Sequence, residues 1–382
     1  MSGFHYFDYN ATTRIASEVF EAMRPYLTER WGNPSSAYAF GRELKRVVAE
    51  SRESVARLLG AKTDEVVFTS CGTESTNTAL RSAMASNPER RHLIMTTVEH
   101  SANLECGALL AAAGFQVTYL PVSSEGLVDL GALRAAIQPD TALVSVMWAN
   151  NETGVVMPIQ EIGELCREKG VLFHTDAVQA MGKVSVDVGQ VPVDYLSLSG
   201  HKIYAPKGIG ALYVRRGAPY ESLIVGGGQE NGRRAGTQNV PYIAGLGRAC
   251  QLVGKDLEAE SSRLSLLRDR MESAAILRLG AKANGAGAPR VPNTTNLSFP
   301  GIEAEALLLL LEREGICASS GSACSTGSLE PSHVLTAMGV NRSDALGALR
   351  LSLGRDSTAA DVAHLLAILP ALVERLRGAV PA

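Results

Sequence analysis

Short apolar segments alternate with helical patterns along the first two thirds of this chain, and this alternation constrains the fold more than any other sequence feature. Segments with the length and apolar content of buried strands are residues 65–69, 92–97, 115–120, 141–148, 171–175, 194–199 and 210–214. Most are separated by segments with apolar residues at helical spacing, such as 102–113 and 159–169. Such alternation produces right-handed crossovers on a mostly parallel sheet. The sequence therefore predicts an α/β fold with a mostly parallel seven-stranded sheet.

The last third of the chain differs in composition. Residues 256–275 are charged and rich in leucine, and a flexible stretch with several glycines follows from Ala281. Shorter strand and helix patterns then continue to the C-terminus. We expect a large domain of residues 15–254 and a smaller α/β domain formed by residues 1–14 and 255–382.

Composition argues against several classes of protein. The net charge of the 382 residues is -3 with both signs interspersed, which offers no basic face to nucleic acid or to an anionic membrane. The start does not resemble a signal peptide, and the longest strongly apolar run, 306–311, is too short to cross a bilayer. The six cysteines include no C-x-x-C pair, which argues against a disulfide framework and a zinc site. We expect a cytoplasmic protein without a metal.

Lys202 stands where the expected strand 194–199 ends, in a loop bounded by glycines. A lysine there can form a Schiff base with a carbonyl compound, and pyridoxal 5′-phosphate (PLP) is the commonest carbonyl cofactor that needs one. The alternative is a surface loop lysine, and Lys207 shows how common those are. Lys202 indicates a cofactor site only if other strand ends carry matching groups.

Two further strand ends carry groups that suit the ring of PLP. Asp176 ends a buried strand, where a carboxylate is costly unless it meets a cation such as a protonated pyridine nitrogen. Gln179 could point at the same ring. His100 could stack on a flat cofactor or transfer protons near neutral pH. The alternatives are a helix cap for Asp176 and a surface position for His100.

Two more strand ends suit the polar substituents of PLP. Gly72 and Thr73 open an expected helix, whose free N–H groups could hold a phosphate, although such a turn also caps helices. An asparagine amide in the 150–154 loop could donate to a phenolate oxygen. Ligands of parallel sheets bind at the carboxyl ends of the strands, and five strand ends here carry compatible groups. A PLP site is therefore the favoured interpretation.

Nine short motifs occur along nearly the whole chain in an order and spacing that one family shares. They are NATT at Asn10, GNPSS at Gly32, CGTES at Cys71, VEH at Val98, NNETG at Asn150, HTDAVQ at His174, SGHK at Ser199, RRAGT at Arg233 and SSGSACS at Ser319. Together they resemble the cysteine desulfurases, which are class V aminotransferases of PLP fold type I, the aspartate-aminotransferase fold. The long SSGSAC loop resembles group I, and MWANNETG and EPSHV are most similar to the branch that serves nitrogenase cluster assembly and hence nitrogen fixation.

The resemblance implies how PLP would be held. The residues that would contact the ring are His100, Asn151, Asp176, Gln179 and Lys202, with Lys202 as the Schiff-base lysine and Asp176 on the pyridine nitrogen. The residues that would hold the phosphate are Gly72, Thr73, Ser199, His201 and, from the neighbouring subunit of a homodimer, Thr237. One departure is visible, because Gly72 stands where many relatives have alanine.

The resemblance also implies how the substrate would be handled. Arg350 would bind the carboxylate of L-cysteine, close to Asn151. Lys202 would remove the α-proton, and His100 is a candidate for deprotonating the thiol. Cys324, in a run of small flexible residues, would receive the sulfur as a persulfide.

We therefore expect a PLP-dependent cysteine desulfurase that converts L-cysteine to L-alanine and supplies sulfur to an iron–sulfur scaffold protein. A selenocysteine lyase or another small PLP aminotransferase on the same fold is the alternative, against which Cys324 argues. A sulfur-relay or scaffold-binding protein with a degenerate cofactor site is a second alternative, and the set of Lys202, Asp176 and His100 argues against it.

Overall fold

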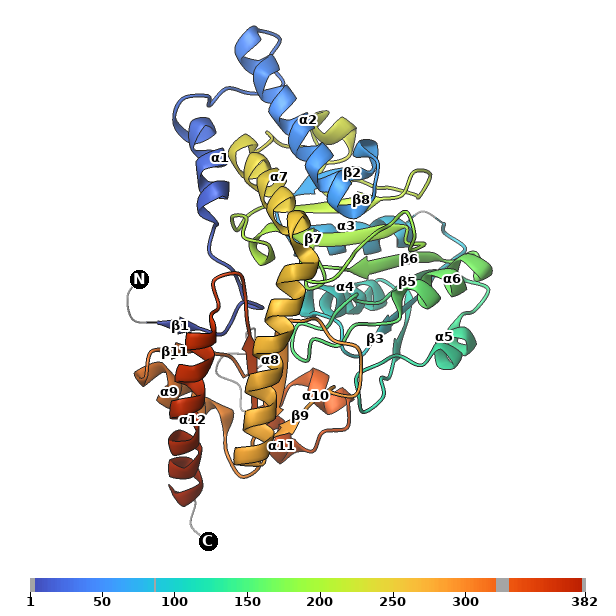
Figure 1. The fold of residues 1–382 in the computed structure, drawn as a ribbon. Helices are drawn as coiled ribbons and strands as arrows, with labels where there is room; N and C mark the ends of the chain where they lie inside the picture. The colour runs from blue at the N-terminus through green and yellow to red at the C-terminus, as the bar shows by residue number, and fades with distance from the viewer. Residues whose placement is uncertain (1–3, 86, 321–329, 380–382) are drawn as a thin grey trace.

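The computed structural model describes residues 4–85, 87–320 and 330–379, and a seven-stranded sheet lies at the centre of its larger part (Figure 1). In spatial order the strands are β2 (Val66–Thr69), β8 (Gly210–Val214), β7 (Tyr195–Ser199), β6 (Leu172–Asp176), β5 (Thr141–Ser145), β3 (His92–Thr96) and β4 (Gln116–Leu120). Strand β8 is antiparallel to both neighbours, whereas the other neighbouring pairs are parallel. The predicted α/β fold with a mostly parallel seven-stranded sheet is confirmed.

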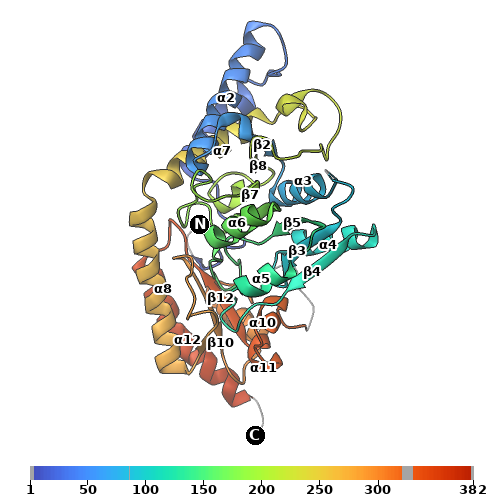
Figure 2. The same ribbon diagram turned by 90° about the vertical axis from the view of Figure 1, so that its right-hand side faces the viewer.

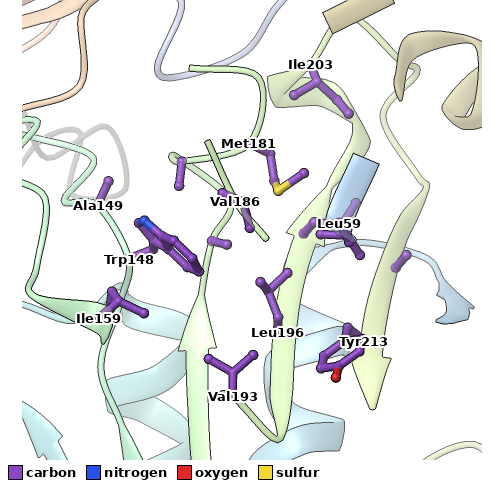
Figure 3. Packing of buried hydrophobic residues seen from close by; sticks show 14 of the residues in the cluster. Leu59, Trp148, Ala149, Ile159, Met181, Val186, Val193, Leu196, Ile203 and Tyr213 are labelled. Carbon is purple, nitrogen blue, oxygen red and sulfur yellow. The ribbon is translucent and has the colours of Figure 1, made fainter. Parts of the chain in front are cut away.

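Helices cover both faces of this sheet, because alternate residues of each strand point to opposite faces. On one face α3 (Gly72–Ala85) and α4 (Ser101–Ala112) pack on Leu93 and Leu212. The other face is covered by α2 (Ala39–Leu59), α5 (Leu130–Ala136), α6 (Ile159–Lys169) and α7 (Val240–Lys255). Figure 3 shows part of this second core, in which Leu196 of β7 and Tyr213 of β8 lie near Leu59 at the end of α2.

Helix α7 has no counterpart among the elements predicted from the sequence. It packs against α2 and against α1 (Ser17–Thr28), and two glycines allow this close approach. A Cβ atom on Gly247 would lie 2.7 Å from the Cα atom of Ser51, and one on Gly245 would lie 2.8 Å from the Sδ atom of Met23. Glycine lowers helix propensity, so the two residues that permit this packing also make the helix difficult to predict from the sequence.

The rest of the chain forms a smaller part with its own hydrophobic core, which contains Phe7 and residues between 264 and 373. Helices α8 (Leu257–Leu279), α9 (Ala304–Arg313) and α12 (Ala359–Ala379) contribute to this core. Helices α10 (His333–Ala337) and α11 (Arg342–Leu346) follow in the same part of the chain but bury their apolar residues in the core of the larger part. Helices α8 and α12 pack side by side (Figure 2). The division into domains of residues 15–254 and of residues 1–14 with 255–382 stays a prediction.

Two small sheets complete this part. Strand β10 (Thr294–Ser298) is antiparallel to β9 (Lys282–Ala283) and to β12 (Ala348–Ser352). Strand β1 (His5–Tyr6) is parallel to β11 (Ile316–Cys317), which brings the N-terminal segment beside residues more than 300 positions later. Within the described ranges, no helix combines the length and apolar character needed to cross a membrane.

Candidate active site

A cavity of ≈ 520 Å³ at the carboxyl ends of β3, β5, β6 and β7 contains most of the predicted site residues. Those that line it are Gly72, Thr73, His100, Asn151, Asp176, Gln179, Ser199, His201, Lys202 and Arg350. Thr237 instead lines a separate cavity of ≈ 250 Å³ beside β2, and its side chain is exposed. Cys324 lies outside the described residues. The chain therefore brings together all the other predicted site residues.

Lys202 ends the short 3₁₀ helix Gly200–Lys202, which follows β7 directly. A Cβ atom on Gly200 would lie 2.8 Å from the Cγ2 atom of Ile209, so only glycine fits this turn. The Lys202 Nζ atom donates hydrogen bonds to the carbonyl oxygens of Asn10 (2.5 Å) and Ala11 (2.7 Å). The N-terminal segment thus orients the amine that the sequence singled out.

Asp176 is the last residue of β6 and is buried. Its Oδ1 atom accepts a hydrogen bond from the Val178 backbone N–H at 2.9 Å. Burial raises the pKa of this carboxyl, and the charges of His100 and Lys202 oppose the rise. The net effect is a raised pKa, so a cation bound beside this carboxyl would favour its ionised form.

His100 caps the N-terminus of α4, since its Nδ1 atom accepts a hydrogen bond from the Ala102 backbone N–H at 3.1 Å. Burial lowers the pKa of His100, and the charge of Asp176 opposes this change. A backbone N–H can only donate, so Nδ1 carries no proton. In the neutral ring the proton is therefore on Nε2.

One end of the cavity is suited to an anion. Helix α3 begins there at Gly72, and the N–H groups of a first helical turn lack intrahelical acceptors. A Cβ atom on Gly72 would lie 3.0 Å from Val178 and 3.4 Å from Ser199, so α3 begins in close contact with the strand ends. The His201 ring is neutral, because burial and then Lys202 lower its pKa to about 4.

The donor set fits PLP. A phosphate would meet the start of α3 with the hydroxyls of Thr73 and Ser199, a pyridine nitrogen would meet the Asp176 carboxylate, and an aldehyde would meet the Lys202 amine. These three kinds of group line the same cavity.

Arg350 lies in β12 and is 2 % exposed, yet it lines the cavity. Its Nη1 atom donates to the carbonyl oxygen of Asn151 at 3.0 Å, and its Nη2 atom donates to Oδ1 of Asp8 at 2.7 Å. A guanidinium fixed by two partners is oriented in advance for a carboxylate ligand.

Lys183 is a buried residue near the cavity that sequence reasoning missed. Its Nζ atom donates to Oδ1 of Asn10 at 3.1 Å and to Oε1 of Gln179, while Nε2 of Gln179 donates to the Asn10 carbonyl oxygen at 3.0 Å. Burial lowers the pKa of Lys183 well below its usual value. The four-residue spacing from Gln179 was the available sequence signal. This network fixes the Gln179 amide with its nitrogen end on Asn10.

Asn10 is the centre of this network, although sequence patterns indicated only a polar turn at this residue. Besides Lys202, Gln179 and Lys183, it binds the backbone of Asn151 at 3.1 Å and the hydroxyl of Thr294 at 2.8 Å. It therefore links the cavity to β10 of the smaller part.

Glu99 is a fully buried carboxyl next to His100. It accepts hydrogen bonds from the Thr96 hydroxyl (2.7 Å), the Met147 backbone N–H (2.9 Å) and the Asn103 amide (2.7 Å). Burial raises the pKa of Glu99 to about 8. The Oδ1 atom of Asn103 has no hydrogen-bond partner among the described residues, so this amide can rotate to accept instead of donate.

The Glu99→Gln variant should therefore become more stable than the parent protein as the pH rises. Between pH 4.5 and 8 the unfolded parent loses the Glu99 proton while the folded protein retains it, which lowers stability by about 1.4 kcal/mol per pKa unit. Glutamine has no such proton, and its Nε2 atom can donate to a rotated Asn103 amide. Urea unfolding at pH 5 and pH 8 tests this, with Glu105→Gln, an exposed site on α4, as control. Parallel pH dependences for the parent and Glu99→Gln would contradict the expectation.

Comparisons with known proteins agree on one family. The aminotransferase class-V family model matches residues 5–365. The chain is 51% identical over 377 residues to a cysteine desulfurase of Nostoc sp., covering 98% of this chain and 94% of the relative. It is 48% identical over 379 residues to the cysteine desulfurase NifS of Azotobacter vinelandii, covering 98% and 94%. A solved NifS-like protein has a TM-score of 0.90 and 40% identity over 97% of this chain and 98% of that one.

Proposed function

This chain belongs to the class-V aminotransferase family and is a PLP-dependent cysteine desulfurase, and we propose which of its residues carry out the reaction. The observation that carries the proposal is that Lys202, Asp176 and Arg350 line one cavity. An amine, a carboxylate and a fixed guanidinium are the groups that the reaction requires for the aldehyde, the pyridine nitrogen and the substrate carboxylate. We propose that L-cysteine is converted to L-alanine in this cavity.

We propose that PLP is held at both ends by this chain's own residues. Gly72, Thr73, Ser199 and His201 bind the phosphate, and Thr237 of a second copy completes this set. Asp176 keeps the pyridine nitrogen protonated, His100 stacks on the ring, and Asn151 and Gln179 lie at the phenolic oxygen. The fixed orientation of Gln179 supports its part in this assignment, because its nitrogen end can donate a second hydrogen.

When bound, PLP supplies an electron sink for bond breaking at the substrate α-carbon. Arg350 binds the substrate carboxylate and so fixes the α-carbon near Lys202. The Lys202 amine then accepts the α-proton, which requires it to leave the Asn10 and Ala11 carbonyls. His100 donates its Nε2 proton to the β-carbon after sulfur has left, which completes the methyl group of L-alanine. Cys324 takes the sulfur as a persulfide.

The partners follow from the same proposal. The exposed position of Thr237 outside the cavity supports a homodimer in which a second copy brings this residue to the phosphate. Resemblance to NifS supports an iron–sulfur scaffold protein of the nitrogenase branch as sulfur acceptor. Free cysteines throughout the described residues suit the reducing cytoplasm.

Activity assays on the parent protein and on Cys324→Ser test the function. The parent with PLP should form equal amounts of alanine and transferred sulfur from L-cysteine. Cys324→Ser should keep the visible absorption of bound PLP but lose sulfur release, because a serine hydroxyl is a poor nucleophile toward sulfur. Cys317→Ser in β11 serves as the matched control and should retain activity.

Two outcomes would contradict this assignment. Sulfur release by Cys324→Ser at the parental rate would remove Cys324 from the mechanism. A larger kcat/KM for L-selenocysteine than for L-cysteine, together with independence from Cys324, would instead favour a selenocysteine lyase.

A further inference from the structure

His333 is a second imidazole of the cavity, and none of the proposed roles uses it. It is the first residue of α10, its side chain is exposed, and its Nε2 atom lies 3.0 Å from the carbonyl oxygen of Glu99. A carbonyl oxygen can only accept a hydrogen bond, so Nε2 of His333 carries a proton. The Nδ1 atom of the neutral ring therefore carries a lone pair.

The two imidazoles of the cavity differ in the proton transfers that they can perform. In His100 the lone pair of the neutral ring is on Nδ1, which already accepts from the Ala102 backbone N–H. Neutral His100 can donate a proton from Nε2 but has no second lone pair to accept one. His333 has the opposite arrangement, because its donor nitrogen is bound to Glu99 and its Nδ1 atom can accept.

The residues that connect His333 to the substrate site are in contact. Arg350 donates to the Asn151 carbonyl oxygen, and the next residue, Glu152, accepts a hydrogen bond from the Ser332 hydroxyl at 2.5 Å. Ser332 also caps α10 by accepting from the Val334 backbone N–H at 3.1 Å. The start of α10, and with it His333, is therefore fixed relative to the guanidinium that would bind the substrate.

A buried acidic residue, Glu152, interacts with His333. Glu152 is a buried carboxyl, and the charge of His333 is among the interactions that oppose the rise of its pKa on burial. Arg350 acts on Glu152 in the same sense. The His100 ring beside His333 has a lowered pKa and stays neutral, so it does not compete for the proton. Ionised Glu152 would be the anionic partner of an imidazolium at His333.

We propose that His333 accepts the thiol proton of the substrate L-cysteine, an inference that rests on the proposed desulfurase function. In this step the S–H bond breaks and a bond forms between the proton and Nδ1 of His333. The electron pair of the S–H bond stays on sulfur, so this sulfur no longer carries a proton when the Cys324 thiolate attacks it and the bond between sulfur and the β-carbon breaks. The imidazolium faces Glu152, and no oxidant or reductant is needed.

The His333→Gln variant removes the basic nitrogen that would accept the proton but can keep the hydrogen bond to the Glu99 carbonyl oxygen. The glutamine Nε2 atom can replace the histidine Nε2 as donor to the Glu99 carbonyl, but glutamine has no basic nitrogen. With L-cysteine, kcat/KM should fall by about 10²-fold or more, as expected for the loss of a general base. The decrease of kcat/KM toward acidic pH in the parent protein should be absent in the variant. The absorption of bound PLP should not change. His364→Gln in α12 is the matched control.

A substrate without a thiol proton gives the decisive comparison. β-Chloro-L-alanine expels chloride and has no S–H bond, so His333→Gln should release chloride from it at the parental rate. Added imidazole should restore part of the L-cysteine activity of His333→Ala. An equal loss with both substrates would show that His333 is structural, and an unchanged rate with L-cysteine would leave it no role. Failure of the parent protein to bind PLP or to form alanine would overturn the proposed function instead.

Discussion

Lys202→Ala should fold, bind PLP without a covalent bond and lose cysteine desulfurase activity by about 10²- to 10⁴-fold or more, the range for a missing acid–base group. The phosphate-binding residues at the start of α3 are unchanged, so PLP should still be held there. The variant loses two hydrogen bonds from Nζ to the carbonyls of Asn10 and Ala11, so its melting temperature should decrease modestly.

Borohydride reduction followed by mass spectrometry provides the measurement. The parent protein should carry a PLP adduct on the peptide that contains Lys202, and Lys202→Ala should carry none. Lys169→Ala, an exposed residue at the end of α6, is the control and should keep its activity and its adduct. An adduct on Lys207 or on the buried Lys183 would refute the assignment of Lys202.

Asp176→Asn should change activity and stability in opposite directions. Asparagine keeps the acceptor for the Val178 N–H but has no charge to hold a pyridine nitrogen protonated, so kcat should fall about 10²- to 10³-fold. Burial raises the pKa of Asp176, which means that its charge destabilises the folded protein without cofactor above the pKa of an unfolded aspartate. The variant without PLP should therefore melt higher than the parent at pH 7, with the difference disappearing near pH 3.

Asp194 offers a matched control, because it is also buried but lies at the opposite end of β7. It accepts from the Phe173 backbone N–H at 2.8 Å and from Arg215 at 2.6 Å. Asp194→Asn breaks the pair with Arg215 and should lower the melting temperature without changing kcat. If both variants changed stability and activity in the same direction, Asp176 would be only a structural residue.

The sheet and the residues at its strand ends could be predicted because both signals are local. An apolar run that ends in a polar residue places Asp176, His100 and Lys202 at the same edge without any knowledge of distant contacts. Helix α7 was not predicted from such patterns, because the glycines that allow its close packing also lower its helix propensity.

The supporting network could not be predicted, because it consists of contacts between distant segments. Lys183 binds Asn10 across 173 positions, and His333 binds Glu99 across 234. The neighbouring residues in the sequence do not indicate either contact, and the sequence alone does not distinguish a buried lysine from an exposed one. The in-trans role of Thr237 and the persulfide role of Cys324 stay predictions.

The pairing of β1 with β11 has a consequence for synthesis on the ribosome. The Asn10 and Ala11 carbonyls hold Lys202, but the segment that carries them is fixed by Ile316, Cys317 and Ser352, which are translated more than 300 residues later. At about 5–20 residues per second, the N-terminal segment waits tens of seconds for these partners. The central sheet can form during this time, whereas the cofactor pocket is complete only after residues 316–352 have left the exit tunnel.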